Sequence, residues 1–183
     1  MSKVGQKPIS IPQEVKVNLE GKRLKVTGSL GEQVVVIPEN LKAVISENEI
    51  RVERELETKK VRSLHGTYAR LIQNAIIGVS RGFEKILEIV GTGYRGIMEQ
   101  DVLVLSLGYS HQIRVASPTG IKLSVEENKI KVFGIDKELV GTTAHNIKIL
   151  RKPDSYKGKG IRFLGEKLRL KPGKAAAKTT GAA

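Results

Sequence analysis

Hydrophobic and polar residues alternate along two stretches of the chain in a way that is typical of half-buried β-strands. The first stretch spans residues 31–52 and the second spans residues 111–132. The alternating apolar positions are Leu41, Ala43, Ile45, Ile50 and Val52 in the first stretch and Ile121, Leu123, Val125, Ile130 and Val132 in the second. We therefore expect both stretches to form strands that turn one face toward a core.

The two stretches also match each other at an offset of 80 residues. Pro38 aligns with Pro118, and the Glu-Asn pair at 47–48 aligns with a second Glu-Asn pair at 127–128. Strand patterns resemble one another by chance, but a shared proline, a shared turn pair and a shared order together favour duplication of one unit.

A segment with helical spacing follows each stretch. In the first copy Gly82 marks a plausible end of the helix. In the second copy Asp136 is placed to cap a helix that ends before Pro153. The expected buried faces consist of Val61, Leu64, Tyr68, Leu71, Ala75, Ile76 and Val79 in the first helix and Leu139, Val140, Thr143, Ile147 and Leu150 in the second.

These patterns predict an α+β fold of two tandem duplicated domains, each an antiparallel β-sheet covered by one α-helix. We expect residues 1–81 to form the first repeat. Residues 82–174 are expected to form the second repeat, which includes a basic segment at 151–174. We expect the remaining residues, 175–183, to be a disordered tail, because they have too little apolar surface to fold by themselves.

Charge separates the end of the chain from the rest. The chain carries 32 Lys and Arg against 19 Asp and Glu, a formal net charge of +13. Residues 151–183 hold 10 cations and 2 acids, a balance of +8, whereas residues 81–150 hold 9 and 8. A positive field that is this concentrated attracts polyanions, which are nucleic acids or anionic membrane surfaces.

Other features of the composition narrow the class of protein. The chain has no cysteine, which excludes a disulfide framework, a thiolate nucleophile and a cysteine zinc site. No run of residues approaches eighteen apolar positions, and no apolar segment follows the first lysines. We expect a soluble, cytoplasmic protein that neither spans a membrane nor is exported.

The stretch "GTGYRG" at residues 91–96 fits the glycine pattern of a dinucleotide-binding loop. A dinucleotide-binding loop requires a helix directly after its glycines, because the helix N-terminus holds the pyrophosphate. The residues that follow, "IMEQDVLVLSLG", end in a strand pattern instead. We therefore interpret 91–96 as a sharp turn or bulge between strands.

No set of side chains indicates catalysis. His65, His111 and His145 lack the i, i+4 partner of a helical zinc site, so we expect them to be ordinary surface or partly buried residues. Ser63 lies near His65 but lacks a nucleophile elbow and an acid to complete a triad. We expect no catalytic residue, no metal, no cofactor and no enzymatic activity.

The basic segment is the strongest candidate for a function, and its pattern favours RNA binding. Its cations can neutralise phosphates, and Tyr156 can stack on a base or donate a hydrogen bond to a phosphate. Gly158 and Gly160 permit close approach of the backbone and let amide groups point at an anion. "GIRF" and "EKLRLK" alternate like short strands, which would hold the cations in fixed positions rather than leave them in a solubilising tail.

The candidate RNA-binding residues are therefore Arg151, Lys152, Tyr156, Lys157, Gly158, Lys159, Gly160, Arg162, Lys167, Arg169, Lys171 and Lys174. A second tier of candidates consists of Tyr94, Arg95, Lys3 and Lys7.

The stretch "PDSYKGKGIRF" at residues 153–163 resembles the C-terminal signature of the bacterial large-subunit ribosomal protein L6 family. "GQKPISIP" at 5–12, "GTGYRG" and "SLGYSH" at 106–111 are similar to other parts of that family, so the resemblance covers residues 1–174. Ser155 stands where the family frequently has proline, which could loosen the turn. Phe163 stands where it frequently has tyrosine, which removes a hydroxyl as a possible RNA contact.

The resemblance implies a fold of two duplicated α+β domains. It also implies binding to large-subunit (23S) ribosomal RNA near the base of the stalk where translation factors dock, with most contacts from the C-terminal domain. The implied partners are that RNA and neighbouring ribosomal proteins, with no membrane and no small-molecule substrate.

Two other classes remain open from the residues themselves. An enzyme could use "GTGYRG" for a nucleotide, and a protein–protein adaptor could carry the basic segment for solubility. Charge does not exclude DNA binding, although no recognition helix rich in Arg, Asn or Gln is visible.

Overall fold

The computed structural model describes residues 4–46 and 48–173 of the chain. These residues form two compact units. One unit comprises the residues up to Phe83 together with Gly134–Lys137, and the other comprises Glu84–Phe133 and the residues from Glu138 onward.

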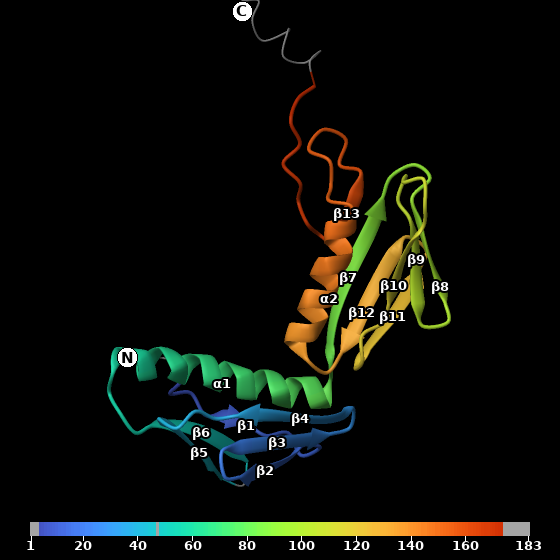
Figure 1. Cartoon of the computed structure of the whole chain (residues 1–183). Coiled ribbons are helices and arrows are strands. Elements are labelled where there is room, and N and C mark those ends of the chain that lie inside the picture. Colours follow the sequence, from blue (N-terminus) through green and yellow to red (C-terminus); the bar gives the residue numbers. More distant parts are fainter. Residues whose placement is uncertain (1–3, 47, 174–183) are drawn as a thin grey trace, which may run out of the picture. The chain divides into compact units, whose positions relative to one another are not determined.

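The first unit consists of two three-stranded antiparallel sheets and one helix (Figure 1). Its elements are β1 (Ile9–Ser10), β2 (Lys16–Glu20), β3 (Arg23–Gly28), β4 (Gly31–Val36), β5 (Leu41–Ile45), β6 (Glu49–Arg54) and α1 (Lys59–Ser80). The strand orders are β1-β6-β5 and β2-β3-β4. Because α1 packs against β3, β4 and β6, it covers strands of both sheets.

Local sequence sets both ends of α1. The backbone N–H of Val61 donates to the Thr58 hydroxyl oxygen at 3.3 Å, which satisfies one of the free donors at the helix start. The helix ends at Ser80, and Gly82 adopts a φ of 75°, a left-handed conformation that favours glycine after a helix. The expected stop at Gly82 is confirmed.

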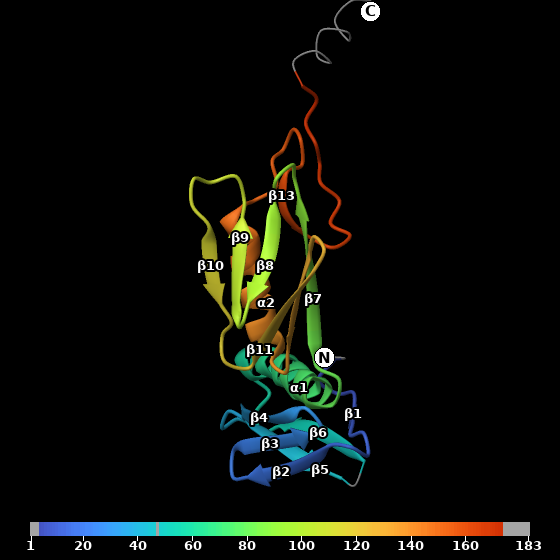
Figure 2. The same ribbon diagram turned by 90° about the vertical axis from the view of Figure 1, so that its right-hand side faces the viewer.

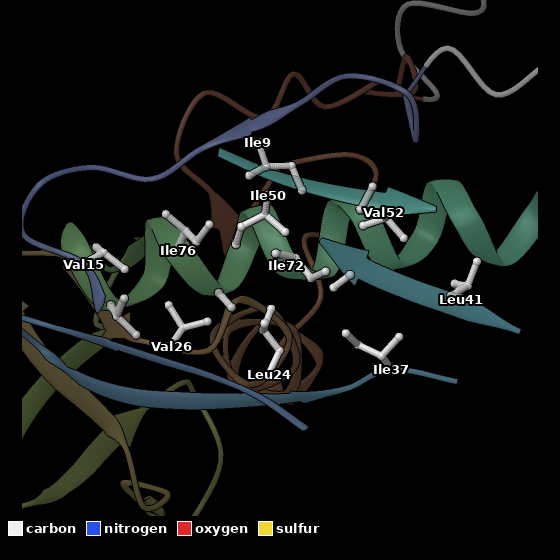
Figure 3. Packing of buried hydrophobic residues seen from close by; sticks show 14 of the residues in the cluster. Ile9, Val15, Leu24, Val26, Ile37, Leu41, Ile50, Val52, Ile72 and Ile76 are labelled. Atoms are coloured by element: carbon white, nitrogen blue, oxygen red, sulfur yellow. The ribbon is translucent and has the colours of Figure 1, made fainter. Parts of the chain in front are cut away.

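The core of the first unit lies between α1 and the two sheets. Ile72 of α1 lies close to Leu24 of β3 and Ile50 of β6, and all three side chains are fully buried (Figure 3). The expectation that Leu71 belongs to the buried face is wrong, since Leu71 is 40% exposed. Successive helical residues are rotated by about 100°, so the centre of the buried face falls on Ile72. The buried helix residues are Val61, His65, Ala69, Ile72, Ala75, Ile76, Gly78 and Val79.

His65 is buried, and the expectation of a surface or partly buried histidine is also wrong. Its ring Nε2 lies 2.8 Å from the backbone oxygen of Val52 on β6. The neighbouring strand β1 pairs with Glu49 and Ile50 and ends before it reaches Val52. The imidazole therefore supplies the hydrogen bond that a longer strand would have made.

The second unit is built mainly from seven strands and one helix. These are β7 (Phe83–Val90), β8 (Arg95–Glu99), β9 (Val102–Ser106), β10 (Ile113–Ala116), β11 (Ile121–Glu126), β12 (Lys129–Gly134), α2 (Lys137–Leu150) and β13 (Gly160–Phe163). They form a three-stranded sheet of order β10-β9-β8, seen in Figure 2, and a four-stranded sheet of order β11-β12-β7-β13. Leu87, Leu103, Leu105, Ile130 and Ile161 are fully buried in its core.

The topology repeats between the two units. The order β2-β3-β4 returns as β8-β9-β10, and the order β1-β6-β5 returns as β7-β12-β11. The aligned prolines close equivalent turns, because Leu41 N–H donates to Pro38 O and Ile121 N–H donates to Pro118 O, both at 3.0 Å. The predicted duplicated α+β fold is confirmed, and each repeat divides its strands between two sheets. β13 has no counterpart among the described strands of the first unit.

The helix α2 also follows the sequence pattern. It begins at Lys137, directly after Asp136, and ends at Leu150, before Pro153. Val140, Thr143, Ala144 and Ile147 form its buried side. Neither α1 nor α2 is long and apolar enough to cross a membrane.

Candidate nucleic-acid interface

The basic segment is attached to the second unit by β13. This strand pairs antiparallel with β7, in a register that runs from Gly160 opposite Val90 to Phe163 opposite Leu87. Figures 1 and 2 both show β13 beside β7, at the edge of the four-stranded sheet. The predicted strand at "GIRF" is confirmed, and its buried Ile161 fixes the segment to the core.

The loop before β13 is closed by its own acidic residue. The Asp154 carboxylate accepts a hydrogen bond from the Lys157 amide at 2.9 Å, and the Asp154 amide donates to the Lys159 carbonyl oxygen at 2.9 Å. The amides of Lys157, Tyr156 and Ser155 lower the pKa of Asp154, with Lys157 the largest cause. We expected amides of this loop to face an external anion, but those three face the Asp154 carboxylate.

Gly160 is required by close packing. Its φ is 150°, and a Cβ atom at this position would lie 2.7 Å from the Lys152 carbonyl oxygen and from the Pro153 Cα. The next residue, Ile161, donates its amide to the Arg151 carbonyl oxygen at 2.8 Å. The glycine therefore lets β13 pass directly beside the chain that leaves α2.

The expectation that "EKLRLK" forms a second short strand is wrong. Residues 166–171 are irregular, and the Lys171 amide donates to the Ser155 carbonyl oxygen at 2.8 Å. Side-chain atoms of Leu168 and Leu170 each lie 3.6 Å from the position that a Cβ on Gly158 would take. The alternating leucines therefore pack over the loop that contains Gly158, and this contact holds the segment without a strand ladder.

Three of the predicted cations are half-buried and already have partners. Arg162 donates from Nε to Glu88 Oε2 at 2.9 Å, and its Nη2 lies 2.8 Å from the same oxygen. Arg151 donates from Nε to the Tyr94 hydroxyl oxygen at 3.2 Å. Lys159 donates from Nζ to the Thr92 hydroxyl at 3.4 Å. These contacts reduce the freedom of the three cations to follow an RNA backbone.

The remaining described cations of the segment are exposed to solvent. None of them forms a salt bridge with a carboxylate in residues 4–46 or 48–173. They are Lys152, Lys157, Lys167, Arg169 and Lys171. Tyr156 is 59% exposed on the same loop, so its ring is accessible as well.

Glu166 is one of only two acids after residue 150, and it serves an internal contact. Lys148 Nζ lies 2.7 and 2.8 Å from its two carboxylate oxygens, and the Phe163 amide donates to the carboxylate at 3.0 Å. Lys148 is the largest cause of the lowered pKa of Glu166. The Lys148 Nζ also lies over the Phe163 ring, 4.8 Å from its centroid. Phe163 is the position at which the family frequently has tyrosine, and this contact needs only the ring and not a hydroxyl.

Residues 91–94 form a tight turn between β7 and β8. The Tyr94 amide donates to the Gly91 carbonyl oxygen at 3.2 Å, and Gly93 has a φ of 77°. A strand and not a helix follows, which confirms the turn interpretation. Of the second-tier candidates, Tyr94 is half-buried and Arg95 is exposed, whereas Lys7 belongs to the first unit. Lys3, Lys174 and the stretch 175–183 lie outside the described residues.

Sequence reasoning missed Tyr109 and Glu88. Tyr109 donates its hydroxyl to the Leu150 carbonyl oxygen at 3.1 Å, and its ring centroid lies 4.9 Å from Arg151 Cζ. The feature of the sequence that could have identified Tyr109 is its position directly after Gly108, beyond the end of β9. His111 and His145 are exposed, and residues 4–46 and 48–173 contain no group of three or more His, Asp or Glu placed to hold a metal ion.

Comparison with known proteins gives consistent matches to one family. The model of the family described as Ribosomal protein L6 matches residues 11–82 and 90–163. Large ribosomal subunit protein uL6 from Hydrogenobaculum sp. is 50% identical over 178 residues, which cover 97% of this chain and 98% of the relative. The uL6 protein of Staphylococcus carnosus is 45% identical, with 95% of this chain and 98% of the relative covered. The uL6c protein of Spinacia oleracea is 43% identical, with 97% and 81% covered.

Proposed function

The chain belongs to the ribosomal protein L6 family and is a protein of the large ribosomal subunit, and on this premise we propose that it binds ribosomal RNA. The exposed cations of segment 151–174 contact the phosphates of large-subunit (23S) ribosomal RNA, near the base of the stalk where translation factors dock. The expected absence of enzymatic activity agrees with the relatives, which are ribosomal proteins.

One observation carries the proposal. Five cations lie exposed on a segment that is tied to the core through β13 and through the Asp154 loop, and none of the five forms a salt bridge with a described carboxylate. Each phosphate that such a cation neutralises releases condensed counterions, which favours binding. Because the backbone of the segment is held by hydrogen bonds, less conformational entropy is lost on binding than a free tail would lose.

The same proposal assigns roles to the rest of the chain. Residues 1–81 and 82–174 act as separate folding units, and the second unit supplies most of the RNA contacts. Lys174 is a further phosphate-binding cation, and Gly158 and Gly160 shape the loop that carries Lys157. Arg95, Lys3 and Lys7 make secondary contacts, and neighbouring ribosomal proteins near the stalk base are the remaining partners.

Chemical footprinting of 23S ribosomal RNA with the purified chain tests the proposal. We expect protection of a compact site near the stalk base, with an affinity that falls steeply as salt rises. Binding to an unrelated structured RNA of equal length serves as the control and should be weaker at every salt concentration. Equal affinity for both RNAs would contradict the proposed specificity for 23S ribosomal RNA. The absence of any protected site and of any RNA binding would favour a protein–protein adaptor with a solubilising segment.

A further inference from the structure

A pocket of about 460 Å³ opens in the second unit where α2 ends. Ligand pockets commonly measure roughly 300–1,000 Å³, so the volume suits one small organic group. The wall brings together two aromatic rings, three cations and one carboxylate. The residues that matter here are Tyr94, Tyr109, Arg151, Lys152, Asp154 and Lys159.

Tyr94 is held in place by two glycines and by Arg151. A Cβ atom on Gly91 would lie 2.7 Å from Tyr94 Cδ2, and a Cβ atom on Gly108 would lie 3.0 Å from Tyr94 Cε1. Only glycine at these two positions leaves room for the ring in this orientation. The Tyr94 hydroxyl oxygen accepts the hydrogen bond from Arg151 Nε, so this part of the wall is formed before any ligand arrives.

The guanidinium of Arg151 is held by both tyrosines. Its Cζ lies 4.9 Å from the ring centroid of Tyr109 and 5.9 Å from that of Tyr94. Hydrogen bonds to Tyr109 and Tyr94, in that order of size, raise the pKa of Arg151, so the group stays charged. A fixed, planar guanidinium is a surface on which nucleic-acid bases stack.

The other charges in the wall suit one phosphate group. Lys152 is exposed, and Lys159 is half-buried with its Nζ 3.4 Å from the Thr92 hydroxyl. Asp154 keeps a negative charge in the same wall, where it accepts the Lys157 amide. Two ammonium groups attract a phosphate, whereas the carboxylate disfavours a ligand with several closely spaced phosphates.

We propose that this pocket holds one unpaired nucleotide of RNA, with its base on the Arg151 guanidinium and its phosphate beside Lys152 and Lys159. The proposal rests on the proposed RNA-binding function and names the RNA element that this site recognises. A base inside a duplex has both faces covered by its neighbours. The pocket therefore selects a nucleotide in a loop, a bulge or an end, where the base is free to leave the stack.

Amide chemical-shift titration of the full chain by NMR tests the pocket with three probes. The probes are AMP, ribose 5-phosphate and inorganic phosphate. We expect AMP to shift the amides of Arg151, Tyr109 and Tyr94 in addition to those of Lys152 and Lys159. The two probes without a base should shift only the lysine amides. Equal responses to AMP and to inorganic phosphate would overturn the proposal, because the pocket would then recognise phosphate without a base.

The variant Arg151→Lys separates the planar surface from the charge. It keeps the cation and removes the stacking plane, so AMP should bind about 5- to 150-fold more weakly while the response to phosphate remains. Arg114→Lys is the matched control, since Arg114 is exposed on β10 and pairs with Glu99 at 3.8 Å. Unchanged AMP affinity in Arg151→Lys would overturn the proposal.

Footprinting of 23S ribosomal RNA with the wild type and with Arg151→Lys separates this proposal from the one it rests on. We expect one nucleotide to lose protection in the variant while the surrounding site stays protected. Salt-dependent RNA binding with no AMP response would overturn the pocket proposal and leave the proposed function standing. An AMP response without any RNA binding would contradict the proposed function and the RNA origin of the nucleotide.

Discussion

Arg162 of β13 lies directly opposite Glu88 of β7, and its Nη2 is 2.8 Å from a carboxylate oxygen of that residue. The pair is half-buried, with about a third of each side chain exposed. Opposite charges at facing positions of an antiparallel pair stabilise the pairing of the two strands. A cation in the middle of the basic signature therefore attaches β13 to the sheet.

This pairing predicts different effects for two kinds of charge removal. Arg162→Gln should lower the free energy of unfolding by about 1 kcal/mol, because Glu88 loses its partner in a partly screened site. It should change the salt dependence of RNA binding by less than the roughly 0.7–0.9 units expected for one phosphate contact. Chemical denaturation and binding to 23S ribosomal RNA at several salt concentrations measure the two quantities.

Replacing three exposed cations should have the opposite outcome. The triple variant combines Lys157→Gln, Lys167→Gln and Lys171→Gln. In this variant the log–log slope of RNA affinity against salt concentration should flatten by about 2–3 units. Stability should change by no more than about 0.5 kcal/mol for each exposed substitution. An unchanged slope in this triple variant, or a flattened slope in Arg162→Gln, would mean that the wrong cations have been assigned to the RNA.

Two glycines with positive φ allow the cost of a steric clash to be separated from the cost of backbone strain. Gly160→Ala adds a Cβ that meets the Lys152 carbonyl oxygen at 2.7 Å, so we expect a loss of at least about 2 kcal/mol. Gly93 has no atom within 4 Å of its Cβ position, so Gly93→Ala should cost about 1 kcal/mol from its φ of 77°. Thermal melts of both variants measure the difference, and equal losses would show that strain and not packing decides at Gly160.

The Lys148–Glu166 contact predicts a pH dependence. The pKa of Glu166 is lowered from its ordinary value of 4.5, so the contact contributes stability above that pH. The contribution should disappear as the pH falls below 4.5 and through the lower folded-state value. The stability difference between the wild type and Glu166→Gln should therefore be full at neutral pH and shrink in acid.

A double-mutant cycle provides the control for this contact. Lys148→Gln and Glu166→Gln should be non-additive at neutral pH, because each substitution removes the same interaction. Both differences from the wild type should shrink over the same acidic range. Parallel stability curves for the wild type and Glu166→Gln down to acidic pH would exclude the assigned role of the carboxylate.

The sequence predicts those parts of the fold that depend on local pattern. Helix ends at Gly82 and before Pro153, the turn at 91–94 and the duplication all follow from spacing and from glycine and proline positions. The burial of His65 could not be predicted from local sequence pattern, because it depends on β1 being too short to reach Val52. That shortness arises from how two distant segments pack.

The candidate site was predictable in location but not in the state of each cation. Charge density and glycines identified the segment, whereas the partner of Arg162 lies 74 residues earlier in the chain. An alternating pattern at 166–171 suggested a strand, but the leucines pack on the Gly158 loop. Tertiary contacts of this kind override a short period-two pattern, since strand preference depends mainly on which neighbours a side chain meets.

The proposed independence of the two repeats gives the last prediction. The fragment 83–174 contains β7 to β13 and α2, so it keeps the buried side chains that form the core of the second unit. It loses the packing of Ile135 against the core of the first unit and the hydrogen bond that Lys137 Nζ donates to the Asn74 side-chain oxygen at 3.3 Å. We expect a cooperative thermal melt with a stability of a few kcal/mol, because a domain of this length can bury a sufficient core.

The fragment also tests where RNA affinity resides. Because it carries every described cation of segment 151–174, it should retain most of the affinity of the full chain for 23S ribosomal RNA and a similar salt slope. The complementary fragment 1–80 has a charge balance of only +4 and should bind weakly and without a distinct protected site. A second fragment that fails to melt cooperatively would refute the independence of the repeats. Equal affinity in fragment 1–80 would instead place the RNA contacts outside the basic segment, because that fragment contains none of its cations.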